Sequence, residues 1–145
     1  MIFLMDPEAL RYPVLALAQD GSIVPVDSPA TLRQCNAIAF WRNHYYDGMV
    51  IIDADEKTWL VTQALPILPA GTVGRAMARL VNGKVQVHLV LEPDTGPDGL
   101  AMAKSRVSRW MDRDGDFWEA SADLDEWKAR VDACPTIDAL IALFR

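Results

Sequence analysis

Two histidines are the residues of this sequence best suited to proton transfer. His44 follows an expected helix, and His88 lies on the polar side of an expected strand. A pair of histidines can act as base and acid in metal-free cleavage of a substrate, provided that both reach it within hydrogen-bond distance. The sequence does not place the two side chains together. A small metal-free hydrolase or nuclease using His44 and His88 is therefore kept as an alternative function.

Three carboxylates cluster at the expected connection of a hairpin: Asp53, Asp55 and Glu56. Paired carboxylates can carry out acid–base or metal chemistry. At the tip of a hairpin they are more typical of a solvated turn, which is how we interpret them. They remain secondary candidates for contact with a partner.

A run of alternating aspartates at Asp112–Asp116 suggests calcium at first sight. An EF-hand loop needs a glycine at its sixth position and a glutamate at its twelfth. Counted from Asp112, these positions hold Phe117 and Asp123, and Gly115 comes too early. The run is therefore interpreted as a turn after a helix. We expect no catalytic residues, no metal and no cofactor in this chain, and hence no enzyme activity.

The segment 112–126 has the most unusual composition of the sequence. It holds seven acids against a single arginine, and this difference equals the formal net charge of the whole chain, −6. Acid clusters speed the association with basic partners, and aromatic residues among them can anchor a complex. The predicted partner-binding residues are Asp112, Asp114, Asp116, Trp118, Glu119, Asp123, Asp125 and Glu126. The last three acids also suit the first turn of a helix, which is the alternative explanation for them.

Length and composition predict one globular domain over residues 1–145. Of the 145 residues 51% are hydrophobic and 23% are charged, values close to those of globular proteins. An acidic isoelectric point near 4.8 disfavours nucleic acid as a partner. Because no apolar run approaches the roughly 20 residues of a membrane span, and no signal peptide is evident, we expect a cytoplasmic protein without a membrane partner.

The first half of the chain is expected to supply hairpins. Residues 14–26 predict a hairpin around Asp20-Gly21, with Pro25 marking an edge strand. Ser28 and Pro29 predict the start of a helix that runs to about residue 43. A second hairpin pairs 49–52 with 58–62, and a clear strand covers 84–92. Between them we expect a loop containing Pro66 and Pro69, a helix over 70–81 and a turn at Asn82-Gly83.

The last third is expected to be helical. One amphipathic helix starts at about Leu100 and ends near Asp112, and a second starts near Asp123 with Ser121 as its cap. Thr136 is expected to cap a short last helix. Strands first and helices last predict an α+β fold, namely an antiparallel sheet of about five strands built from hairpins, with helices packed on one face and a helical C-terminal third.

Cys35 and Cys134 do not form a CxxC motif. They are interpreted as small buried apolar side chains, and the sequence alone leaves open whether they lie near each other.

The layout resembles that of immunity proteins that neutralise bacterial polymorphic toxins, including contact-dependent inhibition toxins. The similarity rests on the first hairpin, the Asp27-Ser28-Pro29 helix start, the run Gly48–Asp53 and the acidic, tryptophan-rich tail segment. The resemblance implies a cytoplasmic protein that binds a cognate protein toxin tightly. From the charge, we expect that toxin to be basic, as a nuclease would be.

A third hypothesis is a non-catalytic adaptor or a homodimer. Such a protein would self-associate through strand edges or through Trp41 and Trp118.

Overall fold

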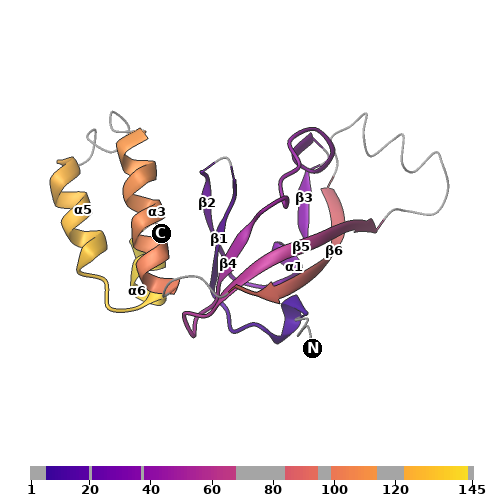
Figure 1. Ribbon diagram of the computed structural model, residues 1–145, viewed down its shortest axis with the longest axis horizontal. Coiled ribbons are helices and arrows are strands. Elements are labelled where there is room, and N and C mark those ends of the chain that lie inside the picture. Colours follow the sequence, from indigo (N-terminus) through magenta and orange to yellow (C-terminus); the bar gives the residue numbers. More distant parts are fainter. Residues whose placement is uncertain are drawn as a thin grey trace.

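The computed structural model describes residues 6–19, 21–36, 38–67, 84–94, 99–113 and 123–143. Its strands are β1 (Val14–Leu17), β2 (Ile23–Val26), β3 (Gln34–Asn36), β4 (Val50–Ile52), β5 (Thr58–Ile67) and β6 (Lys84–Pro93). Its helices are η1 (Pro7–Ala9), α1 (Pro29–Leu32), η2 (Ile38–Arg42), α3 (Gly99–Arg113), α5 (Leu124–Asp132) and α6 (Ile137–Ala142). In Figure 1 the helices α3, α5 and α6 stand at one end of a curled sheet.

The strands form one antiparallel sheet in the order β2-β1-β4-β5-β6-β3. This confirms the α+β class, although the sheet has six strands where about five were expected. Both predicted hairpins are present, β1 with β2 and β4 with β5. Pro25 lies in β2 at the sheet edge, as predicted, where its missing N–H leaves no hydrogen bond unmade.

The sixth strand interrupts the helix expected from residue 29 to about residue 43, whose two ends are helical as α1 and η2. Ser28 caps α1 as predicted, but α1 ends at Leu32, and β3 then pairs with β6. Apolar residues at helical spacing favoured the longer helix, and two of them, Leu32 and Cys35, do contact the same hydrophobic cluster. A strand reaches that cluster as well as a helix does, so the periodicity was not decisive.

The expectation of a loop at Pro66 was also wrong. β5 runs to Ile67, and Pro66 is the neighbour of Val87 on β6. β4 pairs with β5 only as far as Leu60, so beyond that point β5 has β6 as its one described neighbour. Pro66 therefore occupies an edge-like position, which tolerates proline. Pro69, the helix over 70–81 and the turn at Asn82-Gly83 lie outside the described residues.

The sheet carries a hydrophobic cluster on each face. Along β1, Val14 and Ala16 belong to the first core cluster, whereas Leu15 and Leu17 belong to the second. The first core cluster is closed by Leu10, Leu32, Tyr46 and the inward residues of β5 and β6. The second is closed by α3, α5 and α6. The predicted helix layer thus covers one face of the sheet at its β2-β1-β4 end.

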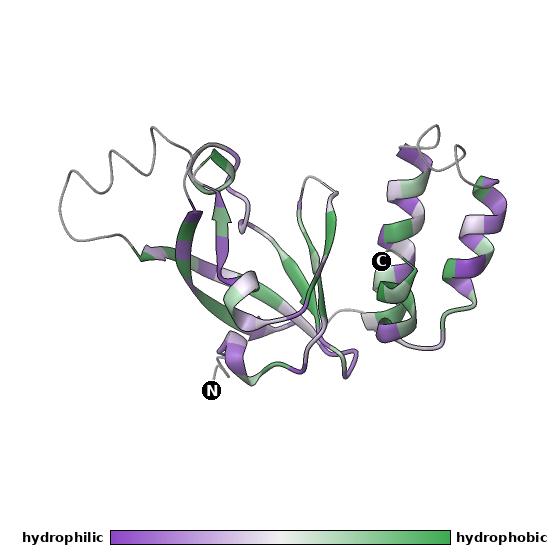
Figure 2. Cartoon of the chain, turned by 180° about the vertical axis from the view of Figure 1, so that it is seen from behind, coloured by the Kyte–Doolittle hydropathy of each residue, from purple (hydrophilic) through white to green (hydrophobic). Residues whose placement is uncertain are grey.

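The C-terminal helices follow the predicted pattern closely. Ala103, Val107 and Met111 of α3 are buried in the second core cluster, and Thr136 caps α6. The cap of α5 is Asp123, whose side chain accepts from the backbone of Asp125, and not Ser121 as expected; Ser121 itself lies outside the described residues. Figure 2 shows the mixed hydropathy of α3 and α5, which is typical of helices with one buried side.

Candidate functional site

The acidic segment is the predicted site, and the structure places four of its eight residues. Asp112 lies in the last turn of α3, Asp123 caps α5, and Asp125 and Glu126 lie in the first turn of α5. All four are exposed. The other four, Asp114, Asp116, Trp118 and Glu119, lie outside the described residues.

Packing of α3 against α5 brings these acids to one end of the helix pair. Lys128 of α5 donates a hydrogen bond to Asp112 of α3, which ties the two helices together there. The hydrogen bond to Asp112 raises the pKa of Lys128 above its usual value. Glu126 accepts from Arg130 at 2.7 Å. Two of the four acids are thus paired with cations of the same chain, and the described surface is less acidic than the sequence indicates.

Trp127 was expected in the core, and it is half-buried against the second core cluster. The guanidinium of Arg130 lies 5.1 Å from the centre of its ring. Through Trp127, the helix that carries three of these acids packs against the second core cluster.

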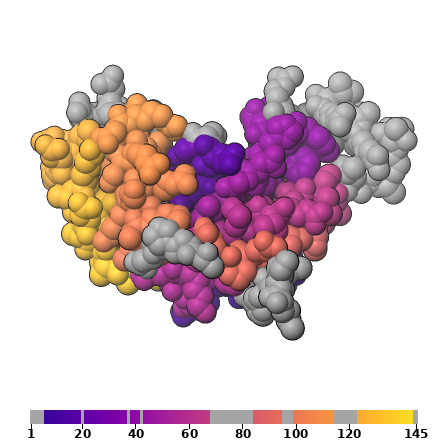
Figure 3. All heavy atoms as spheres, viewed as in Figure 1, coloured from indigo at the N-terminus to yellow at the C-terminus, as the bar shows by residue number. Residues whose placement is uncertain are grey.

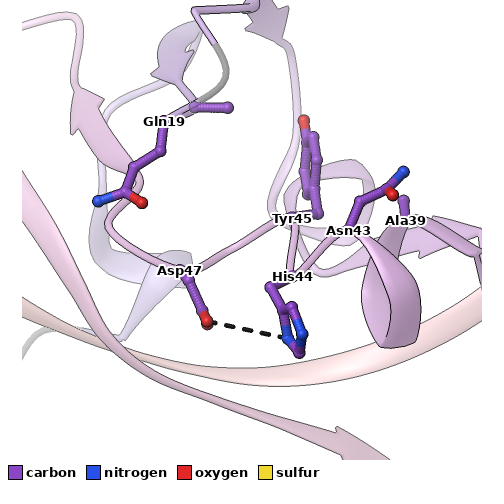
Figure 4. A pocket seen from close by; sticks show the side chains of 7 residues that line it. Gln19, Ala39, Asn43, His44, Tyr45 and Asp47 are labelled. Atoms are coloured by element: carbon purple, nitrogen blue, oxygen red, sulfur yellow. Dashed lines mark ion pairs between the residues drawn. The ribbon is translucent and has the colours of Figure 1, made fainter.

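His44 lines a hollow of about 320 Å³ between the end of β1 and the loop after η2. Figure 4 shows its side chain beside Asp47, with Gln19, Asn43 and Tyr45 around the same hollow. His44 Nδ1 lies 3.9 Å from Asp47 Oδ2, and both side chains are largely exposed. The backbone of His44 adopts a φ of 50°, an uncommon conformation for a residue other than glycine.

His88 is not part of that hollow. It lies on β6 opposite Leu65 of β5, exposed on the face away from the first core cluster. The structure therefore does not bring the two histidines into one described pocket, and the geometry required for a base and an acid acting on one bond is not present.

Asp53 is not the solvated turn residue that was expected. It is only 3% exposed, and its Oδ1 accepts from the backbone of Asp55 and Lys57 at 2.9 and 3.0 Å. Its Oδ2 accepts from Trp59 Nε1 at 2.9 Å. Asp53 therefore holds the β4–β5 turn, and only its neighbours Asp55 and Glu56 reach solvent.

The two cysteines lie in different clusters. Cys35 packs beside the first core cluster and Cys134 is buried in the second, on the opposite face of the sheet. Both are free thiols; Cys134 is buried as expected, whereas Cys35 is only half-buried. Burial raises the pKa of Cys35 to about 11, so its thiol is protonated at neutral pH. Among the described residues no group of three or more His, Cys, Asp and Glu side chains could hold a metal ion.

A basic surface on α3 was missed in the sequence. Arg106, Arg109 and Arg113 line a hollow of about 220 Å³ together with Gln19, Gly21 and Trp110. The net negative charge concealed these arginines, although their spacing of three and four residues on one helix was visible and indicates a shared face.

The comparisons with known proteins identify no relative. No protein-family model matches this chain, and neither a curated protein nor a solved structure is similar to it. In the described part of the chain, no helix has both the length and the apolar character needed to cross a membrane.

Proposed function

We propose that the protein is a non-catalytic binding protein that neutralises a cognate, basic protein toxin by forming a tight complex with it. The observation that carries this proposal is the gathering of Asp112, Asp123, Asp125 and Glu126 at one end of the α3–α5 pair. Asp112 belongs to α3 and the other three acids to the start of α5, so the packing of the two helices adds Asp112 to the surface of the other three. We call it the acidic end.

The internal ion pairs do not prevent such a surface from binding. The Lys128–Asp112 and Arg130–Glu126 pairs are partly or largely exposed. Exposed ion pairs are weak, so cations of a partner can replace Lys128 and Arg130 at small cost. The acids then steer a basic partner toward the complex, and added salt slows its association.

The partner is first captured with the tagged protein from a lysate of the source cells, at low and high salt, and identified by mass spectrometry. The captured protein is then expressed in cells with and without this chain. The proposal expects growth arrest by the partner alone and rescue by co-expression. A partner that is harmless to the cell, or arrest without rescue, would contradict neutralisation.

The acidic end is tested with the variant Asp112→Asn, Asp123→Asn, Asp125→Asn and Glu126→Gln. Asparagine is also a good N-cap, so α5 keeps its start. Association with the captured partner should slow by roughly 10-fold or more at low salt, with little change at high salt.

A matched control removes four exposed charges elsewhere: Glu8→Gln, Asp47→Asn, Asp132→Asn and Asp138→Asn. Glu8 forms an ion pair with Arg33, as Glu126 does with Arg130. The control should associate at nearly the unaltered rate. Equal slowing of both variants would show that net charge and not the acidic end governs binding.

A specific observation also favours self-association as a second candidate. Leu60, Leu65 and Ile67 of β5 are large hydrophobic side chains that are 36%, 48% and 57% exposed. Apolar surface of this kind is typical of interfaces. Trp41, the anchor suggested by the sequence, is instead half-buried with its ring 5.2 Å from Phe40, and Trp118 lies outside the described residues. Sedimentation at increasing concentration tests this candidate, and a constant monomer mass would remove it.

A further inference from the structure

One face of α3 carries three arginines in succession. Arg106, Arg109 and Arg113 are spaced so that they rise along the helix by about 4.5 and 6 Å and remain on the same side. α3 lies beside the β1–β2 turn in Figure 1, and the three side chains line the hollow between them with Gln19, Gly21 and Trp110. We call these six residues the arginine groove.

The groove continues along the helix. A second hollow of about 400 Å³ is lined by Ala101, Met102 and Ser105 and shares Arg106 and Arg109 with the first. Among the described residues that line the two hollows there is no carboxylate. Figure 3 shows the atoms of α3 directly beside those of the first hairpin.

Two of the arginines are not neutralised within the described chain. The five ion pairs between described residues involve neither Arg106 nor Arg109. Like charges three and four residues apart destabilise a helix. Although the chain has 20 acids, no described acid forms an ion pair with Arg106 or Arg109.

The turn of the first hairpin is shaped around the third arginine. Gly21 has a φ of +93°, and a Cβ on it would lie 2.6 Å from Arg113 Nη1. The positive φ favours glycine at this position, and the missing side chain leaves room for the guanidinium beside the turn. Arg113 is held against the turn, at the end of the groove where Gln19 adds an amide group.

From this arrangement we infer that the arginine groove binds a ligand carrying two or more linked phosphate groups. A guanidinium offers a planar fork of donors that matches phosphate oxygens, and several forks on one face fit several phosphates. Linked phosphates place their charges within a few ångströms of each other, as a hollow of about 220 Å³ requires. Carboxylates of an acidic protein segment stand on separate side chains and fill such a hollow less well. The inference is independent of the proposed toxin partner.

The test is calorimetric titration of the full chain with inorganic phosphate, pyrophosphate, tripolyphosphate and a nucleoside diphosphate at constant ionic strength. Pyrophosphate and tripolyphosphate should bind at least about 10-fold more tightly than phosphate, since each added charge-assisted hydrogen bond is strong. Tighter binding of the nucleoside diphosphate than of pyrophosphate would identify a nucleotide as the source of the phosphates, and equal binding would identify the phosphates alone.

The matched variants separate the groove from general charge. Arg106→Gln with Arg109→Gln should weaken pyrophosphate binding about 10-fold or more. The control Lys57→Gln with Lys84→Gln removes the same charge from exposed sites without described ion pairs and should change it less than about 2-fold. Arg106→Lys with Arg109→Lys keeps the charge but loses the forks and should give an intermediate loss.

Three results would overturn the inference. The first is no binding of pyrophosphate at millimolar concentration, and the second is equal weakening by the groove and control variants. The third is tighter binding of a hexaglutamate peptide than of tripolyphosphate, which would make the groove a site for an acidic protein segment. Circular dichroism of each variant checks that the fold is retained.

Discussion

Asp53 stabilises the β4–β5 turn, because each of its carboxylate oxygens accepts a hydrogen bond from the backbone of the turn or from Trp59. Asp53→Asn keeps Oδ1 for the two backbone N–H groups but places an amide N–H₂ opposite the N–H of Trp59. Two donors then face each other in a buried place. We expect the free energy of unfolding to fall by about 1–3 kcal/mol, measured by urea denaturation.

The control for this prediction is a double-mutant cycle with Trp59→Phe, which removes the indole donor. If the hydrogen bond is the cause, the double variant should lose less stability than the two single variants together, by at least about 0.5 kcal/mol. Additive losses would show that Asp53 and Trp59 act separately.

Cys35 predicts a loss of stability at alkaline pH. Burial raises the pKa of its thiol from 9.0 to about 11, so the folded protein holds a proton that the unfolded chain releases earlier. The thiol's stabilising contribution is complete below pH 9 and is lost as the pH rises from 9 toward 11. Burial raises the pKa of Cys134 and Tyr46 as well, so part of the slope has other origins.

Denaturation at half-unit steps from pH 8 to pH 11 measures this effect. Cys35→Ala should flatten the decline most between pH 9 and 10, because the unfolded thiol loses its proton from about pH 9, whereas an unfolded tyrosine such as Tyr12 does so nearer pH 10. An unchanged slope in this variant would assign the decline to other groups.

At the scale of single residues, the sequence shows chemical type but not surroundings. Asp53 was expected to be solvated because its neighbours are acids, yet the donor that buries it, Trp59, is six residues away across a turn. The sequence left open whether His44 and His88 act together. In the structure His44 lines a hollow beside the end of β1, whereas His88 lies on β6 opposite Leu65. Exposure depends on contacts that a local pattern does not contain.

Between elements, α3 approaches the β4–β5 turn closely at its first residue. Gly99 begins α3, and a Cβ there would collide with the backbone oxygen of Glu56 and come within 3.0 Å of Ile52 Cγ2. Gly99→Ala normally helps a helix, but here backbone would have to move. We expect a loss of about 1–3 kcal/mol in the free energy of unfolding, measured by thermal or urea denaturation.

Ala101→Gly, two residues further on and exposed, is the matched control. It carries only the propensity cost of glycine, about 1 kcal/mol, with no steric part. Stabilisation by Gly99→Ala would mean that α3 does not lie as close to the turn as the structure has it.

Element by element, the sequence predicted those parts whose signals are local. The hairpin around Gly21, the Ser28 and Thr136 caps, the strand β6 and the inward face of α3 follow from turn residues, capping and periodicity. β3 was missed because its formation depends on pairing with β6, some 50 residues away. The arginine groove was missed for a related reason, since it needs α3 and the β1–β2 turn together.

On the scale of the whole molecule, β1 and β4 connect two hydrophobic clusters that could otherwise fold separately. Both strands are buried throughout, and alternate residues enter alternate clusters. The division of the chain into one domain over residues 1–145 stays a prediction. The shared strands supply its physical basis, because neither cluster can lose β1 without exposing the other.

This predicts a single unfolding transition that responds equally to either cluster. Leu89→Ala removes a side chain that is 2% exposed in the first core cluster, and Leu140→Ala removes one that is 0% exposed in the second. Each should lower the free energy of unfolding by about 2–5 kcal/mol and move the whole transition.

Two probes measure the transition. Far-ultraviolet circular dichroism follows the secondary structure, and tryptophan fluorescence follows both clusters, since Trp59 lies in the first and Trp110 and Trp127 pack against the second. Coincident curves in both variants follow from a core joined through β1 and β4. If Leu140→Ala lowered the midpoint of only one of two separable transitions, the C-terminal helices would fold as their own unit. The acidic end and the arginine groove would then lie on helices that can open independently of the sheet.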